Sequence, residues 1–175
     1  EKIPTNSSCL TFNNIGIDQM DLSWTSGNGS NRIVVLRETS AVDFDPVNGN
    51  DYAADADFSA GTGVGPSSDN KVVYNGNGSS VTVTGLAQGT TYHVAIFEYN
   101  GSGGTASYLV PGLTDSQATA DTFLSVTTGT LNWGDTSSWV GGVIPPTGAD
   151  VEIRTDMTLD VNVDLNSLTI TNGTF

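Results

Sequence analysis

The chain has 175 residues, a formal net charge of −14 and only 14% charged residues. Gly, Ser, Thr and Asn make up more than two fifths of it, whereas Lys, Arg and Glu, which cover exposed helices, are scarce. This composition predicts an all-β fold, because Gly and Asn favour turns and Thr favours strands. The acidity argues against a nucleic-acid partner, and the absence of a long apolar run argues against membrane insertion.

The sequence offers few side chains for catalysis. It contains one cysteine and one histidine, so an internal disulfide is impossible and the usual acid-base and zinc chemistry is severely limited. His93 lies in an alternating segment whose inward positions are Tyr92, Val94 and Ile96, which places its imidazole on the outer face. We therefore predict no catalytic residues and no enzymatic activity.

The first half of the chain alternates with the period of two that half-buried antiparallel strands require. The turn signals between these segments are rich in Asn and Gly, which tolerate positive φ. Short strands at this spacing are typical of a β-sandwich. The expected strands are residues 10–12, 19–24, 32–37, 71–74, 80–84 and 91–99, with a last strand within 107–118.

A group of motifs in this half resembles the fibronectin type III family. The segment GLAQGTTYHV at 85–94 is similar to the corner between the fifth and sixth strands of that family, and LSWTSGNG at 22–29 is similar to its second strand. The resemblance covers about residues 3–119 and implies an antiparallel sandwich domain over residues 1–119. It also implies that the Tyr92 hydroxyl bonds back to the chain and that Trp24 lies in the core.

The same motifs, together with RIVV at 32–35, VVYNG at 72–76 and FEYNG at 97–101, resemble more narrowly a variant in large secreted or cell-surface proteins of Bacteroidetes. The departure from an ordinary module is a long acidic insertion at residues 39–70. A connection of this length is expected to be functional or packed down on the domain.

This insertion is where the sequence would place a metal. Its carboxylates are the hard oxygen ligands that Ca²⁺ prefers, and no basic residue lies among them. Their spacing does not match an EF-hand loop, so a solvated acidic loop is the alternative. Ca²⁺ is the only cofactor that the sequence suggests, and its candidate ligands are Asp43, Asp45, Asp51, Asp55 and Asp57.

A second β module is expected over residues 120–175. The segments LNWGDTSSW at 131–139, GGVIPP at 141–146 and DVEI at 150–153 resemble the entry of parallel β-solenoids in the same class of surface proteins. Strands are then expected at residues 157–159, 161–163 and 165–170. This implies the truncated start of a β-solenoid, and a complete small sandwich is the alternative.

Trp133 and Trp139 allow two interpretations. They could cap the first rung of such a stack, which needs a cap to bury its apolar face. With Tyr52 and Tyr108 they could instead form a platform on which sugar rings stack, which requires exposed and coplanar aromatic rings. The resemblance to a structural entry segment favours the cap.

Together these features predict a non-enzymatic structural or adhesive segment of a secreted or cell-surface bacterial protein, acting as a spacer and presentation module. The alternative is an accessory, carbohydrate-binding region of a large secreted hydrolase or lyase whose catalytic domain lies elsewhere. The expected partners are the rest of a parent protein or other copies through β edges, with extracellular polysaccharide or a cell surface as further candidates. We expect the chain to be a piece of a longer protein.

Overall fold

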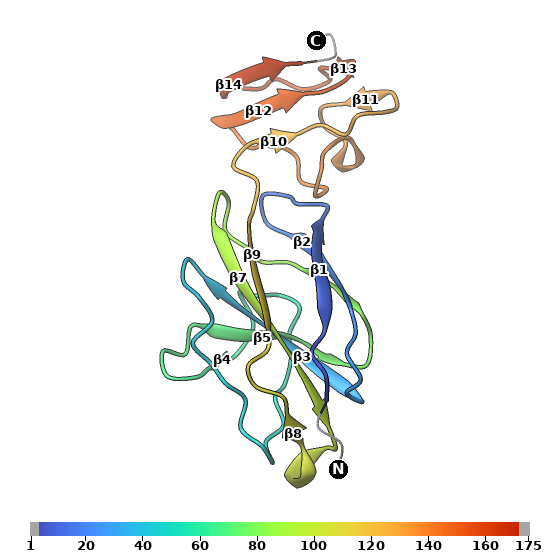
Figure 1. Ribbon diagram of the computed structural model, residues 1–175. Coiled ribbons are helices and arrows are strands. Elements are labelled where there is room, and N and C mark those ends of the chain that lie inside the picture. Colours follow the sequence, from blue (N-terminus) through green and yellow to red (C-terminus); the bar gives the residue numbers. More distant parts are fainter. Residues whose placement is uncertain (1–3, 172–175) are drawn as a thin grey trace.

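The computed structural model describes residues 4–171, which form two β units stacked end to end (Figure 1). The larger unit is a sandwich of two antiparallel sheets. Its first sheet has the order β1-β2-β6, with bounds Ser8–Asn13, Met20–Thr25 and Ser80–Val83. The prediction of an all-β fold is confirmed.

The second sheet of the sandwich has the order β4-β5-β3-β7-β8, and β9 also pairs with β7. Its strands are β3 (Asn31–Glu38), β4 (Gly63–Val64), β5 (Asn70–Gly76), β7 (Thr91–Asn100), β8 (Ser107–Tyr108) and β9 (Leu113–Ala118). This division into two antiparallel sheets is the sandwich architecture that fibronectin type III domains share with immunoglobulin domains. The predicted strands of the first half all lie within or beside observed strands, because the period-2 pattern marks them locally.

The central strands β3 and β7 are buried on both faces. Alternate residues of each strand face the core between the two sheets, which we call the sandwich core and which includes Trp24, Val34 and Ile96. The residues between them face a second cluster on the outside of the larger sheet, the outer core. A strand covered on both sides needs a continuous apolar run, and IVVL at residues 33–36 of β3 supplies one.

Up to residue 171, where the description ends, the smaller unit contains five short strands with parallel pairing. They are β10 (Phe123–Leu124), β11 (Leu131–Asn132), β12 (Ala149–Ile153), β13 (Met157–Thr158) and β14 (Leu165–Ile170). β10, β12 and β14 form one parallel sheet, and β11 pairs with β13 in parallel. Residues 161–163, expected as a strand, instead connect β13 to β14.

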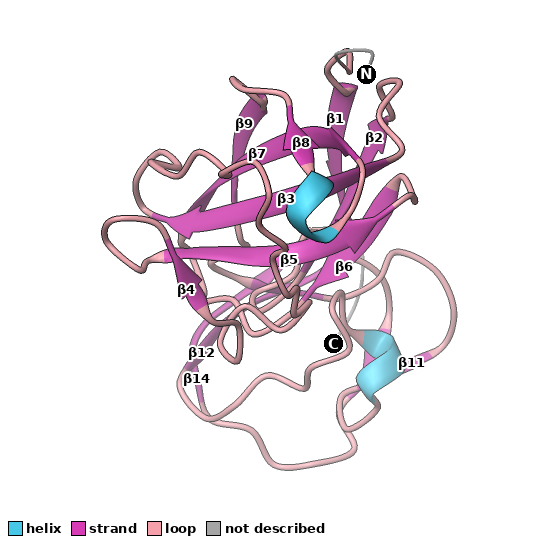
Figure 2. Ribbon diagram, turned by 90° about the horizontal axis from the view of Figure 1, so that it is seen from below, coloured by secondary structure: helices cyan, strands magenta, loops and turns pink. Residues whose placement is uncertain are grey.

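The two short 3-10 helices belong to different units, as Figure 2 shows. Gly103–Thr105 precedes β8 in the sandwich, and Thr136–Ser138 follows β11 in the smaller unit. Within the described residues, no helix is long and apolar enough to cross a membrane.

Candidate functional site

The long insertion at residues 39–70, which we call the connection, packs down on the sandwich. Phe44 and Tyr52 from the connection contact each other edge to face, with ring centroids 5.2 Å apart. Phe44 also meets Phe97 of β7 at 6.4 Å, and Tyr52 meets Tyr108 of β8 at 5.8 Å. The connection therefore covers the outer face of the larger sheet and explains why Phe97, a solvent-side position in the strand pattern, is buried.

Further along, the connection closes one side of the sandwich. The N–H of Asp55 donates to the Val72 carbonyl of β5, and the N–H of Thr84, just after β6, donates to the Ala56 carbonyl. These bonds link the two sheets through the connection. Phe58 then enters the sandwich core and packs edge to face against Tyr92, with centroids 5.1 Å apart.

The five candidate calcium ligands do not form one site. Asp43 pairs with Arg37 at 2.9 Å and accepts a bond from the Asn70 amide at 2.7 Å. Asp51 accepts from the Gly103 N–H, and Asp55 from the Asp57 N–H, so each carboxylate serves a different local bond. Asp45 is exposed. Within residues 4–171 no three acidic, His or Cys side chains converge as metal ligands, so the predicted Ca²⁺ site is not supported.

The Asp57 carboxylate instead stabilises a turn of the connection. Its carboxylate accepts bonds from the Ser59 hydroxyl at 2.6 Å and from the Ser59 N–H at 2.9 Å. The Ser59 hydroxyl above all, with the N–H groups of Ser59 and Ala60, holds the pKa of Asp57 below its ordinary value, against a smaller effect of desolvation. This turn positions Phe58 for insertion into the sandwich core.

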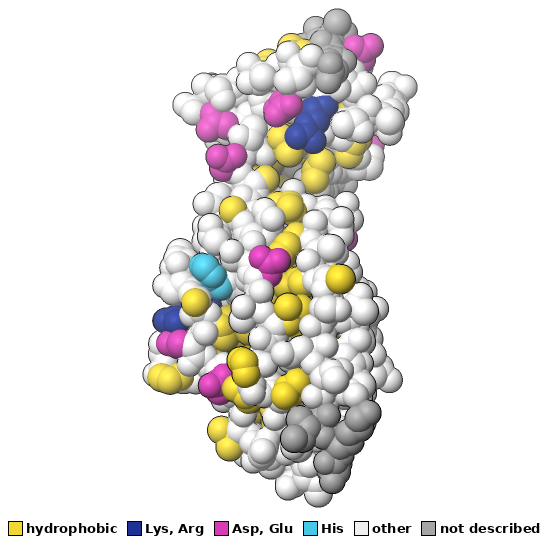
Figure 3. Space-filling model, viewed as in Figure 1, with side chains coloured by type: hydrophobic (Ala, Val, Ile, Leu, Met, Phe, Trp, Pro, Cys, Tyr) yellow, Lys and Arg dark blue, Asp and Glu magenta, His cyan; other side chains and the backbone are white. Residues whose placement is uncertain are grey.

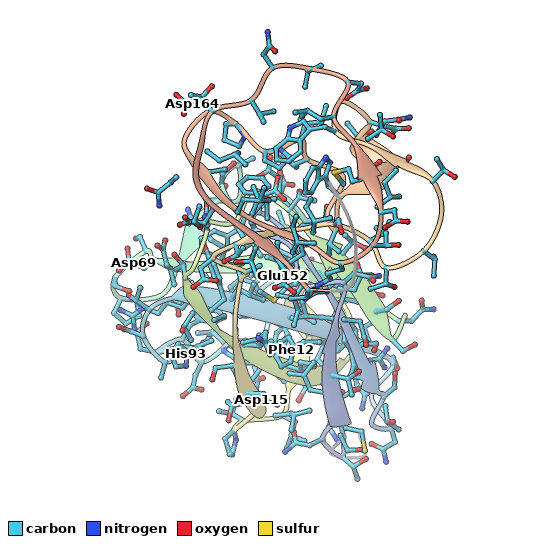
Figure 4. The ribbon with its side chains drawn as sticks, turned by 90° about the horizontal axis from the view of Figure 1, so that it is seen from above. Phe12, Asp69, His93, Asp115, Glu152 and Asp164 are labelled. Atoms are coloured by element: carbon cyan, nitrogen blue, oxygen red, sulfur yellow. The ribbon has the colours of Figure 1, made fainter. Side chains whose placement is uncertain are left out.

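Charged side chains gather at one open cleft, which is lined by Arg37, Glu38, Asp69 and Lys71, and Arg37 pairs with Asp69 at 3.7 Å. On the face shown in Figure 3 the other charged side chains lie singly or in small groups. His93 lines a shallow cleft with Val42, Asp115 and Ser116 on the outside of β7 and β9. Figure 4 labels Asp69, Glu152 and Asp164 at separate places on the two units. A second open cleft lies over the connection, lined by Phe44, Val47, Tyr52 and Pro66 with Asp45 among them.

The two residues assigned structural roles lie in the sandwich core. Tyr92 is buried, and its hydroxyl accepts a bond from the Ala87 N–H at 2.8 Å, which ties β7 to the turn before it. Desolvation raises the pKa of this phenol. Trp24 is also buried and packs edge to face against Tyr74 at 5.4 Å.

The tryptophans of the smaller unit are not exposed, which corrects the prediction of a sugar platform. Trp133 and Trp139 have only 1% and 2% of their surface accessible, and their rings meet edge to face at an interplanar angle of 73°. Buried, non-coplanar rings offer no flat face to a sugar. Tyr108, the third ring of that proposal, is buried as well, and Tyr52 is half-buried in the connection.

Trp139 lies in a segment that covers the first strand of the parallel sheet. The N–H of Val126 donates to the Ser138 carbonyl and the N–H of Val140 donates to the Leu124 carbonyl, both at 2.9 Å. The Trp139 indole donates to the Trp133 carbonyl at 3.0 Å, which fixes the turn of this segment. Residues 138–140 therefore occupy the outer edge of β10, on the side away from β12.

A feature that sequence reasoning missed is the joint between the units. Ile17, in the turn between β1 and β2, packs into the apolar core of the smaller unit, which we call the C-terminal core. The Ala120 N–H donates to the Gly16 carbonyl at 2.8 Å, and the Ala120 carbonyl accepts from the Gly89 N–H at 3.0 Å. The signal in the sequence is a pair of apolar residues, Ile15 and Ile17, in an otherwise polar turn.

Comparisons with known proteins add likeness of fold only. No family model matches the sequence, and no curated protein does. A redesigned β-sandwich protein is similar with a TM-score of 0.45 and 17% identity, over 66% of this chain and 95% of that chain. A fibronectin type III domain of human fibronectin type III domain containing protein 3 gives 0.44 and 17%, over 69% and 89%.

The fibronectin type III domain of human collagen XX gives a TM-score of 0.41 and 19% identity, over 68% of this chain and 94% of that chain. Because all three TM-scores are below 0.5, the description of the larger unit depends on its own strand order. By that order, residues 8–118 form a fibronectin type III-like sandwich.

Proposed function

We propose that the chain is a non-enzymatic structural and adhesive segment of a secreted or cell-surface bacterial protein, in which two β units form a stiff spacer and presentation module. The observation that carries this proposal is the joint. Adjacent domains usually move relative to one another unless their interface is well packed or bonded. Here the residues that would form a linker are held by hydrogen bonds to two turns of the sandwich.

The joint restricts both bending and twisting. Ala120 is bonded to Gly16 through its N–H and to Gly89 through its carbonyl, so two separate turns of the sandwich hold one residue. The side-chain amide of Gln88 adds a bond to the Asp121 carbonyl at 2.6 Å. Ile17 fills part of the C-terminal core, so bending at the joint would expose apolar surface from both units.

The smaller unit supports a finer version of the proposal, in which it is the start of a parallel β-solenoid. Its chain returns twice to the same sheet in the same direction, through β10, β12 and β14, and β13 returns beside β11. Such coils bury their apolar side chains between successive rungs. The segment at residues 138–140 covers the first rung on the side facing the sandwich.

Double electron-electron resonance tests the spacer directly. Spin labels at Ser79→Cys in the sandwich and Asn162→Cys in the smaller unit, both exposed positions, are introduced in a Cys9→Ser background. We expect one narrow distance distribution. A matched control with a flexible Gly-Ser insertion after Ala120 should broaden it, and a wild-type distribution as broad as that of the control would contradict a stiff joint.

A further inference from the structure

The two edges of the parallel sheet in the smaller unit differ in whether another segment covers them. The edge at β10 is covered by residues 138–140, as described above. β14 is the last strand of the order β10-β12-β14, and within residues 4–171 it pairs only with β12. An uncovered strand presents a row of N–H and C=O groups that can pair with another strand.

The hydrogen-bonding direction of β14 can be assigned residue by residue. The Thr171 N–H donates to the Ile153 carbonyl, so Thr171 and Thr169 direct their backbone groups toward β12. Successive residues of a strand direct these groups to opposite edges. The N–H and C=O groups of Leu168 and Ile170 therefore point away from β12, along the uncovered edge.

The same two residues carry unburied apolar side chains. Leu168 pairs with Val151 and Ile170 with Ile153, and these β12 residues are 1% and 0% exposed in the C-terminal core. Leu168 and Ile170 continue this inward column, yet they are 39% and 42% exposed. An additional strand beside β14 would cover them.

Three other edge strands carry features that discourage pairing. β1 has an irregular register between Ser8 and Thr11, β4 has only two residues, and β9 carries Asp115. Bulges, shortness and charge are the usual means of blocking an edge. β14 has the sequence LNSLTI, with six residues, no charge and no proline.

The absence of charge on β14 indicates which partner can pair with this strand. Two copies of a chain with a net charge of −14 repel each other over most of their surfaces. The residues of β14 are all neutral, and two carboxylates of the neighbouring strand β12 are engaged by local bonds. Asp150 accepts from Asn166 and Ser167 of β14, both at 2.6 Å, and Glu152 pairs with Arg154 at 3.4 Å.

We propose that β14 is a docking edge for a second copy of this chain, forming a two-fold dimer in which the β14 strands pair antiparallel. A two-fold axis at Leu168 sets this residue opposite its counterpart, and the outward backbone groups of both then bond to each other. The sheet continues from one copy into the other. This inference goes beyond the spacer role and does not depend on the stiffness of the joint. It is an alternative to the solenoid version of the proposed function, because a further coil of a solenoid would pair with the same edge of β14.

The first test is the mass of the protein as a function of concentration, by sedimentation equilibrium. Wild type should shift from monomer to dimer. Leu168→Lys places a charge on the inward side of the edge and should raise the dissociation constant at least about tenfold. Thr169→Lys makes the same charge change on the outward side and should alter it less than about threefold.

The second test needs no variant. Amide hydrogen exchange of the wild type should slow with rising concentration at Leu168 and Ile170, while the already bonded amides of Thr169 and Thr171 change less. Protection of β12 in Leu168→Lys shows whether that variant keeps its fold. A monomer at every concentration, or a dimer that survives Leu168→Lys and is lost in Val47→Lys at the exposed tip of the connection, would overturn the proposal.

Discussion

Ile15 and Ile17 are two residues apart in one turn, yet they pack into different cores. Ile15 lies against the sandwich core, and Ile17 lies against the C-terminal core. Because an extended segment points alternate side chains in opposite directions, a single turn can be shared by two units. This turn is the physical basis of the proposed stiff joint.

The shared turn predicts separable effects on stability. Ile17→Ala should lower the free energy of unfolding of the smaller unit by about 1–2 kcal/mol, less than for a fully buried isoleucine because the side chain is only partly buried. Ile15→Ala should act on the sandwich instead. Native-state hydrogen exchange, read separately on β12 and on β3 or β7, measures both, and equal losses in the two units would contradict the division.

Tyr92→Phe should destabilise the sandwich by about 1–2 kcal/mol, because it removes the acceptor of the Ala87 N–H. Trp24→Ala should cost about 3–5 kcal/mol through the cavity that it leaves. Urea unfolding measures both changes. Tyr52→Phe is a matched control, because its hydroxyl accepts from the Val47 N–H in an exposed turn. If Tyr92→Phe unfolds like the wild type, the Tyr92 bond does not stabilise the turn.

A buried ion pair should be sensitive to removal of one partner. Arg32 and Glu98 are 3% and 0% exposed, with Arg32 Nε 3.0 Å from Glu98 Oε1. The same carboxylate oxygen accepts from the Gly27 N–H and the Ser7 hydroxyl, so it holds the N-terminal segment against the sandwich.

Arg32→Met leaves the Glu98 carboxylate buried without its counterion and should cost about 3–5 kcal/mol. The double variant Arg32→Met with Glu98→Met should cost clearly less than the sum of the two single variants. Urea unfolding of the four proteins gives the coupling free energy. Additive single effects would show that the pair contributes no specific stabilisation.

The bonds to Asp57 predict an acid-dependent contribution to stability. Its pKa is lowered from the ordinary 3.8, first by the Ser59 hydroxyl. A group with a depressed folded-state pKa stabilises the fold above its unfolded pKa and loses that effect as pH falls through the folded pKa. The difference in melting temperature between wild type and Asp57→Asn should therefore be present above about pH 4 and shrink below it.

Asp45→Asn, at an exposed position of the same connection, controls for the change in net charge. It should shift the melting temperature less than Asp57→Asn at neutral pH. If the melting temperatures of wild type and Asp57→Asn differ by the same amount at every acidic pH, the ionised Asp57 carboxylate does not stabilise the turn that supports Phe58.

Local patterns in the sequence were enough to predict the strands of the sandwich except the two-residue β4, which lies in the connection. The alternation around Tyr92, Val94 and Ile96 determines which side of β7 faces the core, and the turn residues mark where strands end. Residues close in sequence carry this information. For the same reason the corner at Tyr92 could be expected from a ten-residue segment.

The tertiary structure alone decided how distant segments meet. The connection offers five carboxylates, but Arg37, Asn70, Gly103 and Ser59 draw three of them into separate local bonds. From the sequence, Trp133 and Trp139 could form either a sugar-binding platform or a buried cap, and the structure buries both in the C-terminal core. The roles of Ile17 and β14 likewise depend on contacts between units and between coils. The exposure of a side chain is determined by which distant segments pack against it. The residue pattern of a single segment does not contain this information.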